Sequence, residues 1–202
     1  MIGSLALEGV SPGFANPVAD SQRVFRRVLD AMSRPGRLID LDSGIAAASP
    51  HLTAASALAL TLLDFETPVF VALDADGEAF ANWLRFHCGC PITAEPKAAA
   101  YALVLADLLP ALDQFYAGDP KYPDRATTLI VVCAALEGGA AVRLEGPGIA
   151  ETRRIAPAGL PEDFWNQVRA DRSAFQLGVD IILTAGDQII ALPRSTRIVP
   201  EN

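Results

Sequence analysis

A continuous run of mainly β-branched residues at 127–133, TTLIVVC, restricts the fold more than any other feature of this sequence. A run without polar alternation is typical of a strand covered on both faces, so we expect it to be central in a sheet. The apolar run at 68–73 and the segment 101–105 have the same character. The chain is therefore expected to contain several buried strands.

Helical spacing of apolar residues separates these strands. Over residues 17–32 apolar side chains recur near helical spacing, with Asn16 as the expected N-cap and Pro35-Gly36 as the stop. The other predicted helices span residues 53–63, 76–86, 108–116 and 161–172. The other predicted strands span residues 142–145, 179–183 and 189–192, the first as the hairpin mate of 127–133 across Gly138-Gly139.

No internal repeat or long linker divides the 202 residues, and Pro and Gly punctuate the chain at intervals typical of alternating helices and strands. We predict an α/β fold, a single domain over residues 1–202 with a mixed β-sheet flanked by helices. The order of the strands does not follow from the sequence.

The chain is 51% hydrophobic and only 20% charged, below the roughly 25% of ordinary soluble domains. More apolar surface is present than one small core hides, so we expect a buried subunit interface. No apolar stretch approaches the roughly 20 residues of a membrane span, and the N-terminus has no secretion signal. A cytoplasmic protein without membrane contact is expected.

The formal charge of −8 repels polyanions, which argues against nucleic-acid binding. All but two of the 16 basic residues, Lys97 and Lys121, are arginine, and the guanidinium fork suits phosphate and phosphonate oxygens. Arginine-rich composition also arises from codon bias, so composition alone leaves a small phosphate ligand open.

Several function classes are excluded because their motifs are missing: P-loop NTPases, Rossmann dehydrogenases, α/β-hydrolases and zincins. His87, Cys88 and Cys90 could together hold zinc, but the paired C-x-x-C units of zinc sites are absent. We expect reduced cytosolic thiols and no metal.

Charged residues beside Pro or Gly at predicted strand and helix ends are the candidate ligand-binding residues. Arg34, after the first predicted helix, either meets an anion or caps that helix. Glu66, Asp124 and Arg125 precede predicted strands and either bind a ligand or tie loops to the sheet. The full candidate set is Ser33, Arg34, Glu66, His87, Asp124, Arg125, Asp180 and Arg194. None of them can be assigned a catalytic role.

In sequence order, these segments resemble the H subunit of bacterial carbon–phosphorus lyase, the PhnH family. The matching segments are the stretch 25–36 with SRPG at its end, LLDFETPV at 62–69, LRFHCGCP at 84–91, YPDRATTLI at 122–130, GPGI at 146–149, FQLGVDIIL at 175–183 and ALPRST at 191–196. The resemblance covers nearly the whole chain. One departure is FHCGCP, where the family form is nearer FHTGAP, which weakens any role for the two cysteines.

The resemblance implies a fold like the large domain of pyridoxal-phosphate (PLP) transferases, without the cofactor. A Schiff base needs a lysine aimed at the aldehyde. Neither Lys97 nor Lys121 lies in a matching motif. We therefore expect no PLP in this chain.

The resemblance also implies a homodimer that joins the G, I and J subunits, and a reaction carried out with G, I and L. In that step a phosphonate displaces adenine from ATP, giving a ribose 1-phosphonate 5-triphosphate. An acidic chain without a nucleotide motif is poorly suited to this chemistry, so we place catalysis on a partner subunit.

Two alternatives remain open. In one, the subunit has its own anion or nucleotide site at a dimer cleft, built from Glu66, Asp124, Asp180 and the arginines. In the other, the chain is a sensor that binds a phosphonate by itself. Whether this chain is an enzyme on its own therefore stays undecided.

Overall fold

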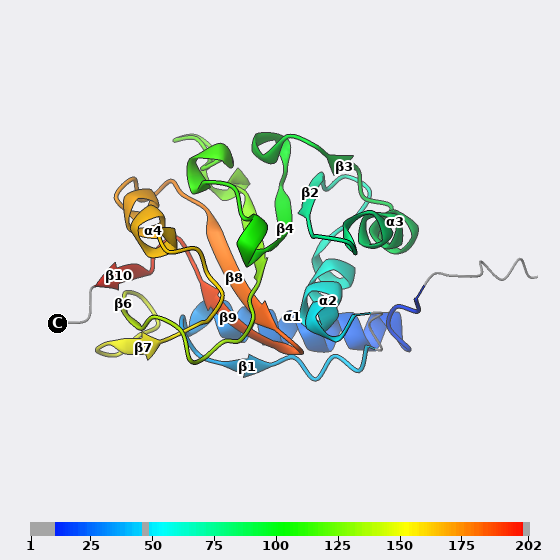
Figure 1. The fold of residues 1–202 in the computed structure, drawn as a ribbon, viewed down its shortest axis with the longest axis horizontal. Coiled ribbons are helices and arrows are strands. Elements are labelled where there is room, and N and C mark those ends of the chain that lie inside the picture. Colours follow the sequence, from blue (N-terminus) through cyan, green and yellow to red (C-terminus); the bar gives the residue numbers. More distant parts are fainter. Residues whose placement is uncertain (1–10, 46–48, 200–202) are drawn as a thin grey trace, which may run out of the picture.

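The computed structural model describes residues 11–45 and 49–199, which build a layered α/β structure (Figure 1). Its main sheet has seven strands. In spatial order they are β1 (Ile39–Asp40), β9 (Gln188–Leu192), β8 (Asp180–Ala185), β5 (Thr128–Val132), β4 (Tyr101–Leu105), β2 (Val69–Ala72) and β3 (Ile92–Thr93). Strands β3, β2, β4, β5 and β8 are parallel, whereas β9 runs antiparallel to both β8 and β1. The predicted α/β class with a mixed sheet is confirmed.

Strand β5 is central, as its composition predicts. It pairs with β4 on one side and β8 on the other. Ile130 and Val132 join the core on one face of the sheet, and Leu129 and Val131 join the core on the other. Because both faces are covered, a continuous apolar run is the pattern that fits here.

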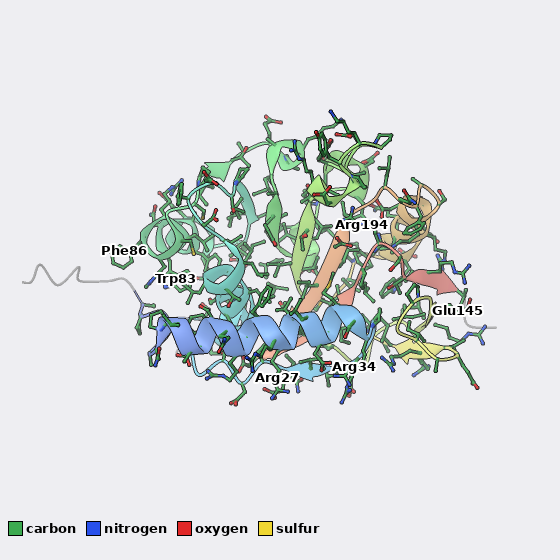
Figure 2. All side chains as sticks on the ribbon, turned by 180° about the vertical axis from the view of Figure 1, so that it is seen from behind. Arg27, Arg34, Trp83, Phe86, Glu145 and Arg194 are labelled. Carbon is green, nitrogen blue, oxygen red and sulfur yellow. The ribbon has the colours of Figure 1, made fainter. Side chains whose placement is uncertain are left out.

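Three helices cover the first face: α1 (Pro17–Ser33), α2 (Thr53–Leu62) and α3 (Gly77–Cys88). Helix α1 begins as predicted, because the Asn16 side chain accepts from the backbone N–H of Ala19 and Pro17 occupies the first turn. Val24, Val28 and Ala31 are its buried residues. In Figure 2 this helix runs across the near side of the molecule.

Helix α4 (Phe164–Arg172) and a small second sheet cover the other face. The order in the small sheet is β10 (Arg197–Val199), β6 (Val142–Glu145) and β7 (Arg153–Ile155). In Figure 1 these elements lie at one end of the molecule, with α2 and α3 at the other. Short 3-10 turns complete the described structure: η1 (Pro50–Leu52), η2 (Pro96–Ala98), η3 (Ala106–Leu108), η4 (Leu112–Gln114) and η5 (Pro123–Arg125). None of the described helices is long and apolar enough to cross a membrane.

The predicted hairpin between 127–133 and 142–145 is wrong. Strand β6 pairs with β7 and β10 in the small sheet, while β4 and β8 occupy both edges of β5. After β5 the Gly138-Gly139 segment turns toward the residues that directly follow β7, and Gly139 N–H donates to the Ala156 carbonyl at 2.7 Å. Local turn chemistry predicted the reversal but not the strand that would fill each edge.

The predicted helix over 108–116 is also wrong. The segment contains only the single turns η3 and η4, separated by extended backbone at Leu109 (ψ 117°). Leu109 precedes Pro110, and a proline both lacks the N–H of a helical bond and disfavours the helical conformation of the preceding residue. The apolar residues of this segment do have helical spacing, but the proline determines the backbone conformation.

Candidate functional site

Five of the predicted site residues lie along one edge of the main sheet, which we call the amino edge. Glu66 precedes β2, Asp124 and Arg125 belong to η5 before β5, and Asp180 begins β8. Parallel strands start at the same edge, and antiparallel β9 ends there, because Leu192 is in register with Ile181. Arg194 follows β9 and so reaches the same place. The topology therefore gathers residues that are far apart in the sequence.

Asp180 and Arg194 form the tightest contact at the amino edge. Both Asp180 carboxylate oxygens accept from the Arg194 guanidinium, one at 2.5 Å and the other at 3.3 Å, and the Arg194 backbone N–H donates to the same carboxylate at 2.7 Å. Arg194 also donates to the Pro123 carbonyl. Its side chain is only 16% exposed, and Figure 2 labels it near one end of the sheet. This guanidinium is neutralised by the chain's own carboxylate and ties η5 to the strands.

A second ion pair lies beside the first, and no sequence pattern predicts it. Arg172, 7% exposed, donates to the Asp171 carboxylate at 2.5 Å and to the backbone carbonyls of Val179, Leu192 and Thr196. Burial lowers the pKa of Arg172, against the opposing effect of Asp171 and Asp180. Burial likewise raises the pKa of the Asp171 carboxyl. The pattern predicted a helix ending at Arg172, but a charged residue in a polar segment normally faces solvent.

Together Asp171, Arg172, Asp180 and Arg194 form a network of two anions and two cations with no formal excess charge. Three more of the Arg172 donors bind backbone carbonyls. Buried charges are tolerated when they are paired and hydrogen-bonded in this way. The network therefore joins α4, β8 and β9 rather than offering a free cation to a ligand.

The other residues of the amino edge are more open. Glu66, Asp124 and Arg125 are exposed. The Arg125 guanidinium lies over the Tyr122 ring at 4.0 Å from its centroid, an ordinary cation–π contact. Of the predicted arginines, Arg125 is therefore the one at this edge whose charge is not held by a hydrogen-bonded carboxylate within the described residues.

Ser33 and Arg34 close the end of α1. The Ser33 hydroxyl donates to the Asp30 carbonyl at 2.9 Å, and the Arg34 guanidinium pairs with the Asp30 carboxylate. Gly36 N–H then donates to the Ala191 carbonyl at 3.1 Å, and Arg153 donates to the carbonyls of Arg34 and Pro35. Of the two roles considered for Arg34, anion binding or capping of the helix, capping fits this arrangement.

Three of the sequence motifs meet at this turn. The segment 146–149 packs on the end of α1, so that a Cβ added at Gly148 would overlap the Ser33 carbonyl oxygen. The segment 191–196 supplies the Ala191 carbonyl, and a Cβ at Gly146 would lie 2.8 Å from the Ser195 carbonyl oxygen. These motifs therefore form a structural junction between the end of α1, the segment 146–149 and the segment 191–196.

His87 lies on α3, on a different element from those of the amino edge. Its Nε2 is 3.0 Å from the Ser11 carbonyl, and its ring lies 4.6 Å from Trp83 and 4.9 Å from Phe86. All three cysteines are free, and burial raises the pKa of Cys88 and of Cys133 to about 12. In the described part of the chain no group of three or more His, Cys, Asp or Glu side chains could hold a metal.

An open cavity of about 650 Å³ lies between α4 and the segment 111–118. Its polar and charged lining consists of Lys97, Asp113, Tyr116, Asp163, Gln167 and Asp171. Three carboxylates against one ammonium disfavour a phosphate or phosphonate there. The cavity does not combine with Arg125 into an anion site.

Comparison with known proteins finds a matching protein family and similar bacterial proteins. Residues 12–199 match the family model described as "Bacterial phosphonate metabolism protein (PhnH)". The chain is 40% identical over 194 residues to the "Alpha-D-ribose 1-methylphosphonate 5-triphosphate synthase subunit PhnH" of Rhizobium meliloti (strain 1021), covering 95% of this chain and 96% of that protein. It is 31% identical over 180 residues to the "Putative C-P lyase subunit protein HtxG" of Stutzerimonas stutzeri, covering 88% and 85% of the two chains.

Proposed function

The chain belongs to the PhnH family of bacterial phosphonate metabolism proteins, and we propose that it is a subunit of the carbon–phosphorus lyase system. In this role it supports formation of α-D-ribose 1-methylphosphonate 5-triphosphate from ATP and a phosphonate. The observation that carries the proposal is the 40% identity to a named subunit of that synthase over nearly the full length of both chains.

Within that system the chemistry belongs to a partner subunit. Displacement of adenine by a phosphonate requires cations that neutralise phosphate and phosphonate oxygens. Here the guanidinium of Arg34 pairs with Asp30, that of Arg172 with Asp171 and that of Arg194 with Asp180. An arginine already paired with its own carboxylate has little charge left for a ligand, which supports a non-autonomous subunit.

The partners we propose are a second copy of this chain and the G, I, J and L subunits of the lyase, in the cytoplasm. The high apolar content and low charge of the chain support a protein that buries part of its surface against other subunits. A phosphonate or a nucleotide phosphate would reach the assembly through those partners.

We also propose that the fold is related to the large domain of PLP transferases and acts without PLP. A Schiff base would need a lysine directed into a closed site. Lys97 and Lys121 are both exposed, and Lys121 lies over the Tyr122 ring. An absorbance band of an internal aldimine in the pure protein would contradict this part of the proposal.

The test of the proposed function is growth of the host on methylphosphonate as the sole phosphorus source. Deleting the gene should abolish growth, and the wild-type gene supplied in trans should restore it. Arg34→Ala, at the capping position, should also restore it. A deletion strain that grows normally on methylphosphonate would remove the proposal.

A second candidate is a subunit with its own anion site at the amino edge. The observation that favours it is the gathering of Glu66, Asp124 and Arg125 at the start of parallel strands, all three exposed. Reconstituted synthase carrying alanine at each position distinguishes the two candidates. Unchanged turnover excludes the second candidate, and loss of turnover at Arg125 with retained assembly establishes it.

The remaining alternative is a phosphonate sensor. The isolated protein would have to bind methylphosphonate by itself, which titration calorimetry measures directly. Our proposal expects no heat of binding under those conditions.

A further inference from the structure

Two loops lie side by side where the central strands of the main sheet begin. Strands β5 and β8 are parallel neighbours, so the segments that lead into them share one end of the sheet. The Gly178 backbone N–H donates to the Ala117 carbonyl at 2.9 Å and links these segments directly. In Figure 1 both segments lie at the upper end of β8. Residues 117–125 and 174–178 therefore form one surface.

An open depression of about 440 Å³ lies between the two loops, a volume in the range of small-molecule sites. Phe175 is 59% exposed there. An accessible aromatic ring bordered by prolines offers a flat apolar surface on which another planar ring can stack. The exposed Gln176 amide beside it can both donate and accept at the edge of such a ring. The residues that line the depression, none of them charged, are Pro120, Pro123, Ala174, Phe175, Gln176 and Leu177.

Two cations belong to the loop that supplies the two prolines. The Lys121 ammonium lies 5.0 Å from the centre of the Tyr122 ring, and the Arg125 guanidinium lies 4.0 Å from it. Both side chains are exposed, and neither forms an ion pair within residues 11–45 and 49–199. Like charges gathered at one ring repel each other. A bound anion would relieve this repulsion.

The two carboxylates of the same loop differ in how their charge is used. Asp119 accepts from the Tyr116 hydroxyl at 2.8 Å and from two backbone N–H groups of the turn that follows it, at 2.8 and 2.9 Å. Its oxygens are therefore engaged inside the loop. The Asp124 carboxylate is exposed and makes no hydrogen bond or ion pair with the described residues. Asp124 is thus the loop carboxylate that would oppose a bound anion.

A stacking surface beside two unpaired cations matches the two halves of a nucleotide. We propose that the surface formed by residues 120–125 and 174–177 binds an adenine nucleotide, with the base on Phe175 and the phosphates at Lys121 and Arg125. Ammonium and guanidinium groups both bind phosphate oxygens. Stacking by itself does not select among bases. The choice of adenine rests on the proposed function, because the synthase consumes ATP. The chemistry stays with a partner subunit, and this chain contributes a binding surface.

The test is titration calorimetry of the pure full-length chain with ATP. All the residues of the proposed site belong to this chain, so the wild type should bind one ATP per chain without the other subunits. Phe175→Ala and Arg125→Ala should each raise the Kd about tenfold, as expected for the loss of one stacking contact or one charge-assisted hydrogen bond. Asp124→Asn should lower the Kd, because it removes the charge that opposes the phosphates.

Phe86→Ala and Arg26→Ala are the matched controls. Phe86 lies on α3 and is 55% exposed, close to the value for Phe175. Arg26 is exposed on α1 and, like Arg125, has no ion pair with a described residue. Both control variants should bind ATP like the wild type. Every substituted side chain is exposed, so all five variants should keep the wild-type Tm.

Three results would overturn the inference. If the wild type binds no ATP, the site is wrong, and the proposed function still stands when the deletion strain fails to grow on methylphosphonate. If Phe175→Ala and Arg125→Ala bind ATP like the wild type, the nucleotide lies elsewhere on the chain. If inorganic tripolyphosphate binds as tightly as ATP and Phe175→Ala weakens neither, the surface takes an anion but no base. A deletion strain that grows normally, with ATP bound at this surface, would instead remove the proposed function and keep the site.

Discussion

Arg194 and Arg197 lie close in sequence, yet their ion pairs differ in burial and geometry. Arg194 contacts both oxygens of Asp180 in a site where each side chain is about one-sixth exposed. Arg197 reaches Glu145 at 3.8 Å with 73% of its own side chain exposed. The first pair holds two strands and η5 together, and the second is a solvent-screened contact.

Removing one partner of the inner pair should therefore be costly. Arg194→Met should lower the free energy of unfolding by about 2–4 kcal/mol, because Asp180 is left partly buried without a counter-charge. Arg197→Met should change it by about 0.5 kcal/mol or less. Urea unfolding followed by circular dichroism measures both, and equal effects would contradict the assignment of the network as structural.

The buried thiols predict a pH dependence. Burial raises the pKa of Cys88 and Cys133 from 9.0 to about 12. Near neutral pH these thiols are protonated in both states and contribute no pH dependence. As pH rises above about 9 the unfolded thiols lose protons while the folded ones retain them, so stability falls with a slope of at most about 1.4 kcal/mol per pH unit for each thiol.

The measurement is urea unfolding in reductant at pH 8 to 10.5, with the double variant Cys88→Ala, Cys133→Ala as the control. The wild type should lose more stability across this range than the variant loses. Parallel declines in the two proteins would show that other groups, such as the tyrosines, account for the whole effect.

The candidate residues were recognisable from the sequence, but their partners were not. Arg34 and Arg194 stood out because each lies beside a proline at the end of an element. That Arg34 pairs with Asp30 and Arg194 with Asp180 depends on tertiary placement. Arg172 was missed because nothing in its local sequence marks it as buried.

At the scale of elements, the end of α1 is fixed by a loop from the other face of the sheet. Gly148 has φ +82° and packs against the Ser33 carbonyl and Pro35. Gly138 has a similar φ of +85°, but a Cβ there would meet nothing within 4 Å. Comparing alanine variants of the two glycines therefore separates the free-energy cost of the left-handed backbone from the cost of the steric overlap.

Gly148→Ala should destabilise the protein by about 3 kcal/mol or more, because the left-handed conformation and the overlap with Ser33 both oppose it. Gly138→Ala should cost only about 1 kcal/mol, the penalty of the left-handed conformation alone. Thermal and urea unfolding of both variants test this, and an equal loss in the two would mean that the 146–149 loop does not clamp α1.

Elements whose pattern is local were predictable, and those that depend on distant partners were not. Strand β5 and helix α1 follow from composition, spacing and capping residues. Strands β1, β3 and β7 are two or three residues long and exist only because a neighbouring strand pairs with them. The partners of β6 likewise follow from topology, which a single strand pattern does not encode.

For the whole molecule, the family was recognisable from motif order, whereas the location of the motifs was not. Segments 33–36, 146–149 and 191–196 meet at one junction, and segments 62–69, 122–130 and 175–183 lead into the amino edge. The first group of segments connects elements of the fold, and the second group places charged side chains along the amino edge. Sequence order alone could not divide the motifs in this way.

We infer that this chain works as part of an assembly. The most direct test is to tag it at its own locus, grow the host on methylphosphonate without phosphate, purify it gently and identify what accompanies it. We expect recovery with the other lyase subunits in a fixed ratio. Recovery of this chain alone, under conditions in which the host is consuming methylphosphonate, would contradict it.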